Sequence, residues 1–230
     1  MKLKRPIKAL AIVALAAVFM LLNNGCKKAN DTTPPIILLK GANPYYLNLK
    51  SAYIEYGAIA NDNVDGEVSN QIVITGVSAI NTTSKGIFSV NYSITDAAGN
   101  SYHTTRKVVV INSADSLAGN YRVHDTCMAT DSSSFNSRIS TSNTVDGMFK
   151  IYDFILAGDS IVGSLTSDTT ITFVPNQYLG GGDSLINAYG VVSFVDTAFN
   201  GSAPIRNLTI YYKWYNGIGT DSCIAKYFHQ

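Results

Sequence analysis

The absence of helical periodicity after residue 30 most constrains what this chain can fold into. No segment of ten or more residues there repeats its apolar side chains with a 3.6-residue period. Only 14% of all residues are charged, whereas Ser, Thr, Asn, Gly and Tyr are common. Long charged side chains typically cover helix surfaces, while β-branched and aromatic residues fit pleated sheets. We therefore predict an all-β protein downstream of the N-terminal segment.

The N-terminal segment has the layout of an export signal. Basic residues precede an apolar run over 9–22, which is too short to span a bilayer as a stable helix but has the length of a signal-peptide core. The residues LLNNGC at 21–26 then resemble a bacterial lipobox. The resemblance implies a lipoprotein signal peptide over 1–25, a lipid on Cys26 and an outer-membrane location in the cell envelope, facing either the periplasm or the surface. Ordinary cleavage near Gly25, without lipidation, is the alternative.

Charge and composition describe the segment that follows. Four of the 17 basic residues precede Cys26, so 13 basic and 16 acidic residues remain after cleavage, a formal charge of −3. Nucleic-acid binding needs a clustered positive surface, so we expect no nucleic-acid partner. Residues 26–35 are polar and end in two prolines, which predicts an extended tether.

Residues 36–112 predict one small β-sandwich. Apolar and polar residues alternate over 88–94, and the turn DAAGN at 96–100 leads into a partner strand over 104–111. Bacterial Ig-like domains of the pesticidal-crystal-protein type, related to hyalin repeats, are similar to this stretch. The shared segments are TPPI at 33–36, GA and NDNVDG within 57–66, GIF at 86–88 and YSITDAAGN at 92–100. The resemblance implies a seven-stranded Ig-like sandwich that acts as a spacer or adhesion module without catalysis.

Residues 118–230 predict an eight-stranded antiparallel meander. Evenly spaced strands of this kind favour a closed or nearly closed barrel, because closure removes the sheet edges. The segment GNYRV at 119–123 resembles the opening of lipocalin-like barrels, and together with TDSCIA at 220–225 it resembles a domain of Bacteroidetes lipoproteins. The strand candidates are 121–129, 137–141, 148–154, 160–166, 170–174, 185–194, 205–215 and 222–228.

Cys127 and Cys223 are the other two cysteines of the chain. An exported chain meets an oxidising compartment, so we expect them to form a disulfide; two buried thiols are the alternative. In a closed meander the first and last strands are neighbours, and the bond would join them. If Cys127 faces Cys223, the antiparallel register places His124 opposite Lys226 and His229 opposite Tyr121. The two histidines then lie apart on opposite faces, which argues against a zinc site.

The segment NDNVDG at 61–66 matches the first half of a calcium-binding EF-hand loop. The first position is Asn61, however, and the twelfth is Ile72, where a bidentate Glu is required. The segment is therefore not an EF-hand. A hard cation could still draw on Asp62, Asp65 and Asp96, but turns with solvated carboxylates explain the same residues. We expect no metal and no cofactor.

Catalytic signatures are missing and one aromatic patch stands out. The sequence has no Gly-x-Ser-x-Gly elbow, no histidine in a recognisable triad frame and no carboxylate spacing of a glycosidase, so we expect no enzyme.

The aromatic patch is YYKWY at 211–215. Alternation separates Tyr211, Lys213 and Tyr215 from Tyr212 and Trp214. One face fills the core and the other reaches solvent, where rings stack on a sugar or an apolar ligand. We select Tyr212 and Trp214 as ligand-binding candidates, with barrel packing as the alternative.

Five segments also match the Asp-Ser/Thr-apolar acceptor pattern of Bacteroidetes O-glycosylation, although the same dipeptides mark turns. The acceptors would be Ser116, Ser160, Thr169, Ser184 and Thr197.

These observations predict a membrane-anchored envelope lipoprotein that acts as a non-enzymatic binding or scaffold module, in which an Ig-like spacer presents the C-terminal domain. One alternative is a carbohydrate-binding or carbohydrate-processing protein, and another is a lipocalin-like carrier of a small apolar ligand. The partner would be a glycan, an apolar ligand or a protein. A wide lumen would favour the carrier, a carboxylate pair in an open cleft would favour carbohydrate processing, and a filled interior with neither would leave the binding module.

Overall fold

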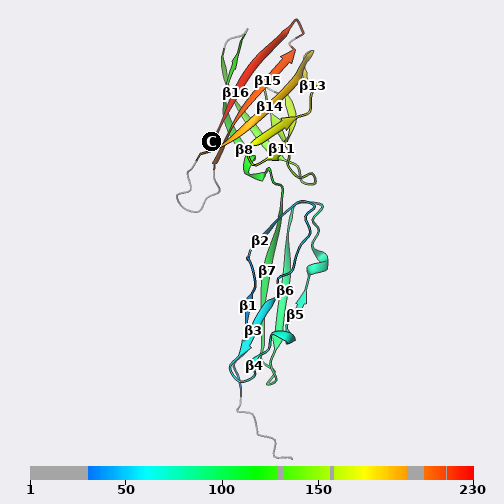
Figure 1. Cartoon of the computed structure of the whole chain (residues 1–230), viewed down its shortest axis with the longest axis vertical. Coiled ribbons are helices and arrows are strands. Elements are labelled where there is room, and N and C mark those ends of the chain that lie inside the picture. Colours follow the sequence, from blue (N-terminus) through cyan, green and yellow to red (C-terminus); the bar gives the residue numbers. More distant parts are fainter. Residues whose placement is uncertain (1–30, 129–131, 156–157, 196–204, 216) are drawn as a thin grey trace, which may run out of the picture. The chain divides into compact units, whose positions relative to one another are not determined.

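The computed structural model describes residues 31–128, 132–155, 158–195, 205–215 and 217–230 (Figure 1). The signal segment, Cys26 and Thr197 lie outside these ranges. The described part is all-β, with short 3-10 helices between some strands, which confirms the predicted fold class. The contacts divide it into two compact units. The first comprises the described residues up to Leu38, Ala58–Val73 and Tyr92–Thr104, and the second comprises Leu39–Gly57, Ile74–Asn91 and Thr105–Gln230.

Two sheets form the Ig-like part of the chain. One has the order β1-β3-β4, and the other has the order β2-β7-β6-β5, in which β2 runs parallel to β7. Seven strands are the number that the Ig-like resemblance implied. Their bounds are β1 (Ile36–Leu39), β2 (Tyr45–Asn48), β3 (Ala58–Asp62), β4 (Gly66–Glu67), β5 (Val73–Thr75), β6 (Gly86–Thr95) and β7 (Ser101–Ile111), with the 3-10 helices η1 (Ser69–Gln71) and η2 (Val77–Ala79) between them.

Strand β6 shows why these residues form sheets. Val90, Tyr92 and Ile94 are buried, whereas the polar residues between them are exposed. This is the period of two that a strand with one buried face requires. Asn100 closes the following turn by donating its backbone N–H to Asp96 Oδ1 at 2.8 Å. The half-buried strand predicted over 88–94 is confirmed.

Nine strands form one sheet in the C-terminal part. They are β8 (Gly119–Cys127), β9 (Ser133–Thr141), β10 (Met148–Tyr152), β11 (Ser160–Ser167), β12 (Thr170–Phe173), β13 (Gln177–Gly180), β14 (Asp183–Val195), β15 (Ile205–Tyr215) and β16 (Thr220–His229). The sheet order runs β12-β11-β10-β9-β8-β16-β15-β14-β13, and β12 also pairs with β14. That pairing, with Ile171 opposite Gly190, closes eight of the strands into an antiparallel barrel. The predicted barrel is confirmed.

Strand β13 is the element of this sheet that the sequence did not predict. It forms a hairpin with β14 alongside the ring, with Tyr178 opposite Ser184. The turn between the two strands contains Gly180, Gly181 and Gly182, which all have positive φ. Residues with a side chain rarely adopt a positive φ, so the three glycines allow a tight reversal of the chain. In the sequence, this glycine-rich segment resembles a plain loop.

The barrel interior is filled by apolar side chains. Each of the eight ring strands contributes at least one buried residue to a single cluster, including Tyr121, Phe149, Ile171, Leu185 and Tyr227. Gly163 shows how closely the side chains pack. A Cβ atom at this residue would lie 2.7 Å from the ring of Phe149 and 2.8 Å from the ring of Phe173.

The first and last barrel strands pair as predicted. Cys127 lies opposite Cys223, His124 opposite Lys226 and His229 opposite Tyr121. The two cysteines form a disulfide with a Cα–Cα distance of 4.1 Å, 96 residues apart in sequence. His124 contacts Phe228 and His229 contacts Tyr121, so the histidines are apart as expected.

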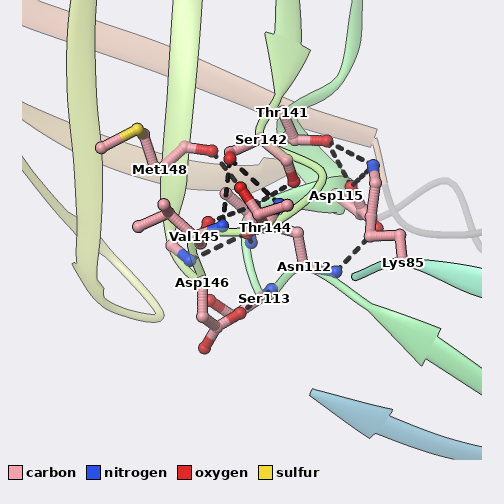
Figure 2. Close-up of polar contacts among 12 residues, drawn as sticks. Lys85, Asn112, Ser113, Asp115, Thr141, Ser142, Thr144, Val145, Asp146 and Met148 are labelled. Atoms are coloured by element: carbon pink, nitrogen blue, oxygen red, sulfur yellow. Dashed lines mark hydrogen bonds and ion pairs between the residues drawn. The ribbon is translucent and has the colours of Figure 1, made fainter. Parts of the chain in front are cut away.

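A polar network surrounds Asn112 in the second unit (Figure 2). The side-chain amide of Asn112 donates to the carbonyls of Ser142, Val145 and Met148, and Asn112 Oδ1 accepts from the N–H groups of Ala114 and Gly147. The network thereby attaches the turn between β9 and β10 to the segment around η3 (Asp115–Leu117). Beside it, Lys85 Nζ pairs with Asp115 Oδ1 at 2.8 Å and also donates to Thr141 Oγ1.

None of the helices in the described ranges is both long enough and apolar enough to cross a bilayer.

Candidate functional site

The outer surface of the barrel carries a groove with a volume of about 580 Å³. It crosses four neighbouring strands, β14, β15, β16 and β8. Strand register explains its composition, because residues paired across strands share one face. One row across the groove runs Tyr189, Tyr211, Ile224 and Thr126. The groove is therefore built on a rigid sheet surface.

Two tyrosines form the aromatic part of the groove. Tyr189 on β14 lies directly opposite Tyr211 on β15, and their rings stack with centroids 5.0 Å apart and an angle of 16° between the planes. Tyr189 is 57% exposed, which leaves most of its ring open to solvent. Exposed rings fixed in this way offer a flat apolar surface with a polar hydroxyl at the edge.

Polar side chains lie beside the two rings. Lys213 lies two residues beyond Tyr211 on β15. It is opposite Asn187 on β14 and Ser222 on β16. All three are exposed and line the same groove. An amide, an ammonium and a hydroxyl group supply both hydrogen-bond donors and acceptors. The combination of a stacking surface and a polar rim suits a ligand with apolar faces and many hydroxyl groups.

The two residues selected from the sequence, Tyr212 and Trp214, lie on the other face of β15. Tyr212 is 4% exposed and donates its hydroxyl to Asp125 Oδ2 at 2.7 Å, and Trp214 packs against the barrel core. Alternation separates the two faces as predicted, but the face with Tyr211 is the one in solvent. The reason is register. Tyr212 lies opposite Cys223, and Cys223 is itself buried.

An ionisable group inside the barrel escaped the sequence analysis. Asp125 is 5% exposed, and its Oδ1 atom accepts no hydrogen bond from the described residues. Burial raises the pKa of this carboxyl, and the charge of Asp221 raises it further. Burial and the neighbouring Asp125 also raise the pKa of the Tyr212 hydroxyl. The sequence does contain a signal for this burial. Asp125 is two residues after Val123 on β8, so both side chains lie on the apolar face of the strand.

Asp125 also lies close to both sulfur atoms of the disulfide, and carboxylate and sulfur atoms in such a group can hold a metal ion. The disulfide removes that possibility, because a cysteine coordinates a metal as a thiolate.

The acidic residues of the Ig-like loops are not the solvated carboxylates that we expected. Asp62 is only 4% exposed and Asp96 only 6%. Asp65 is half-buried, and its Oδ2 atom accepts a hydrogen bond from the Ala97 N–H at 2.9 Å. Asp62 and Asp96 do accept backbone N–H groups in turns, as expected, but their carboxylates are buried and not solvated.

The predicted glycosylation acceptors differ in exposure. Thr169 is exposed, while Ser160 and Ser184 are half-buried. The hydroxyl oxygen of Ser116 is buried, which disfavours modification there. Thr197 lies outside the described residues. Apart from Ser116, these acceptors stay a prediction.

Comparison with known proteins supports the Ig-like part. Residues 37–110 match the family model of the Ig-like domain of bacterial surface proteins. No protein with a curated description matches the chain.

Three solved structures are similar to the chain at low scores. A lipoprotein from Bacteroides thetaiotaomicron is 20% identical with a TM-score of 0.33, over 85% of this chain and 100% of that one. An auxiliary nutrient binding protein from the same organism is 11% identical with a TM-score of 0.32, over 85% and 81%. The CBM51-2 and INT domains of Clostridium perfringens ZmpB, solved with GlcNAc, are 12% identical with a TM-score of 0.28, over 84% and 43%. Likenesses of this size carry no argument about the function of this chain.

Proposed function

We propose that this chain is a non-enzymatic, lipid-anchored protein of the cell envelope that binds a carbohydrate on the outer face of its barrel. Cys26 would carry the lipid, residues 26–35 would form the tether, and the Ig-like sandwich over 36–112 would space the barrel over 118–230 from the membrane. The export signal and the lipobox resemblance support the anchoring.

The observation that carries the binding proposal is the stacked pair Tyr189–Tyr211 beside Asn187 and Lys213. Sugar rings have apolar faces that pack on aromatic rings and hydroxyl groups that need donors and acceptors. An apolar ligand would leave the polar side chains of the groove without partners, and unpaired polar groups cost free energy when they are desolvated. The groove therefore suits a carbohydrate better than a lipid.

The interior of the barrel supports the choice of the outer face. A lipocalin-like carrier needs an open lumen, but apolar side chains from all eight ring strands occupy this interior. The acidic residues Asp125 and Asp221 are each 5% exposed, so they do not line an open cleft where a glycosidic bond could enter. Both alternatives are therefore less well supported than binding at the groove.

The binding proposal is tested by screening the purified protein against a panel of glycans and measuring the affinity of the best one by calorimetry. Replacing Tyr189 or Tyr211 by Ala removes a stacking surface worth about 0.5–1.5 kcal/mol beyond area burial, so we expect binding about tenfold weaker. Tyr178 is the matched control, since it is 71% exposed on β13 and does not line the groove. If no glycan binds, or if Tyr178→Ala weakens binding equally, the proposal fails.

The anchoring is tested with Cys26→Ala. An acyl chain contributes about 0.8 kcal/mol per buried CH₂ group, so its loss should move the protein from the membrane fraction to the soluble fraction. The control is the double change of Cys127 and Cys223 to Ser, which keeps Cys26 and should keep the protein in the membrane. A Cys26→Ala variant that still sediments with membranes after a high-salt wash would disprove the lipid anchor.

A further inference from the structure

Three aspartates from separate segments meet in the first compact unit. Asp31 precedes β1, Asp62 ends β3 and Asp96 directly follows β6. One carboxylate oxygen from each lies within 4.8 Å of the other two. The loop sequences group Asp62 and Asp96 with Asp65, whereas nothing in the sequence around Asp31 connects it to them.

Two of the carboxylate oxygens are buried without a hydrogen bond. Asp62 Oδ1 accepts from the N–H groups of Val64 and Asp65, each at 2.8 Å, whereas Asp62 Oδ2 is buried and has no partner among the described residues. Asp31 Oδ2 is in the same situation. Asp62 as a whole is 4% exposed. A buried carboxylate oxygen without a donor is costly unless a cation or a proton compensates it.

Hydrogen bonds favour the ionised form of Asp96 in this cluster. Asn100 donates its backbone N–H to Asp96 Oδ1 and its side-chain amide to Asp96 Oδ2, both at 2.8 Å. Burial raises the pKa of Asp96, but these hydrogen bonds and those from Gly99 and Ala98 outweigh burial and leave the pKa below its usual value. The ion pairs of Lys85 with Asp115 and of Arg106 with Glu55 belong to the other unit.

We propose that Asp31, Asp62 and Asp96 bind one calcium ion. Calcium takes six to eight oxygen ligands at about 2.3–2.6 Å, so two oxygens on the same ion lie no more than about 5 Å apart. The three carboxylate oxygens satisfy this limit. Backbone carbonyls and water would complete the shell, as is usual for a flexible calcium site.

The surrounding hydrogen bonds hold the three segments in place for the ion. Asn100 Nδ2 also donates to the backbone carbonyl of Asp31 at 3.1 Å, which links the entry to β1 with the turn after β6. Asp65 Oδ2 accepts from the Ala97 N–H and links the turn after β3 to the same place. Calcium would therefore fix the point where the chain enters the Ig-like domain.

The test uses the purified full-length protein, stripped of metal by chelator and titrated with calcium alone in a calorimeter. We expect one calcium ion per chain and a melting temperature several degrees higher with calcium, because a ligand that binds only the folded state stabilises it. Cleavage by a protease near residues 31–35 should slow in the presence of calcium. This second measurement reports on the segment that carries Asp31.

The decisive variants are Asp62→Asn and Asp96→Asn. Asparagine at residue 62 can still accept from the Val64 and Asp65 N–H groups, so the turn is kept and only the charge is lost. Calcium affinity depends on the charge of the ligands, and we expect at least about a tenfold loss in each variant. Without calcium, Asp62→Asn should melt at or above the temperature of the unchanged protein, because it relieves repulsion. This result separates loss of the ion from a folding defect.

The matched control is Asp168→Asn, an exposed residue between β11 and β12, which should leave calcium binding unchanged. The proposal is overturned if the unchanged protein binds no calcium at millimolar concentration, or if Asp62→Asn keeps full affinity. It is also overturned if magnesium binds as tightly as calcium, since magnesium demands shorter bonds and near-ideal octahedral geometry.

Discussion

At the scale of single residues, Asn112 shows how one buried side chain can hold a turn (Figure 2). Asn112 is 1% exposed, and its amide group satisfies carbonyls at Ser142, Val145 and Met148 at distances of 2.9–3.1 Å. An asparagine matches this need because it offers two donor hydrogens and one acceptor oxygen. Without it, the Ser142 carbonyl and the Gly147 N–H would lose these hydrogen bonds.

We expect Asn112→Ala to lower the free energy of unfolding by more than about 2 kcal/mol, because each buried polar group left without a partner costs about 1–3 kcal/mol. Urea denaturation measures the loss. Asn143→Ala is the control, because Asn143 is exposed in the same turn and surface changes of this kind cost within about 0.5 kcal/mol. Equal losses in the two variants would show that the side-chain network is not what stabilises the turn.

At the scale of elements, strand β8 combines an apolar inner face with one acid. Tyr121 and Val123 are fully buried on this face, and Asp125 follows them. The carboxyl pKa of Asp125 is raised by burial, so the folded barrel binds a proton at this residue more tightly than the unfolded chain does. A raised carboxyl pKa contributes stability that is complete below the ordinary value of about 3.9 and is lost as the pH rises through the folded-state value.

Asp125→Asn should therefore raise the melting temperature of the barrel at pH 7, because burial penalises the ionised form of Asp125 and asparagine has no such form. The gain should shrink as the pH falls towards about 4, where Asp125 becomes protonated in both the folded and the unfolded chain. Asparagine can still accept the hydroxyl hydrogen of Tyr212. Calorimetric melting at several pH values measures the effect, with exposed Asp168→Asn as the control. A gain that is independent of pH would mean that the effect does not come from ionisation.

At the scale of the whole molecule, barrel closure depends on the pairing of β8 with β16. These strands lie far apart in sequence, so their pairing carries a large loop-closure cost. The disulfide between Cys127 and Cys223 spans 96 residues at this junction. In the loop-entropy model, a crosslink of this span stabilises the folded state by about 4–5 kcal/mol.

Changing both cysteines to Ser should lower the stability of residues 118–230 by a few kcal/mol and leave residues 36–112 unaffected, because the crosslink constrains only the unfolded barrel segment. Hydrogen exchange followed by mass spectrometry measures both regions in one experiment. Faster exchange confined to barrel peptides is the expected result. Equal acceleration in the Ig-like peptides would show that the two regions unfold together. The unchanged protein treated with reductant serves as the control, since it should reproduce the pattern.

Local patterns in the sequence determined much of this molecule. Alternation over 88–94 and the turn at 96–100 predicted β6 and its partner, because a strand with one buried face repeats every two residues. Eight such segments and two remaining cysteines predicted the barrel, its closing pair and the register of His124 with Lys226. These features follow from the short-range periodicity of the strands and from one long-range link, the pair Cys127 and Cys223.

Only the tertiary structure decided which face of β15 is inside. Register between β15 and β16 places Tyr212 opposite the buried Cys223, and a shift of one residue would have exchanged the two faces. The structure likewise brought Asp31 to Asp62 and Asp96, residues from three segments whose spacing in sequence says nothing about their distance. The physical reason is the same in both cases. A periodic pattern shows that two faces exist, whereas the pairing of distant segments decides what each face meets.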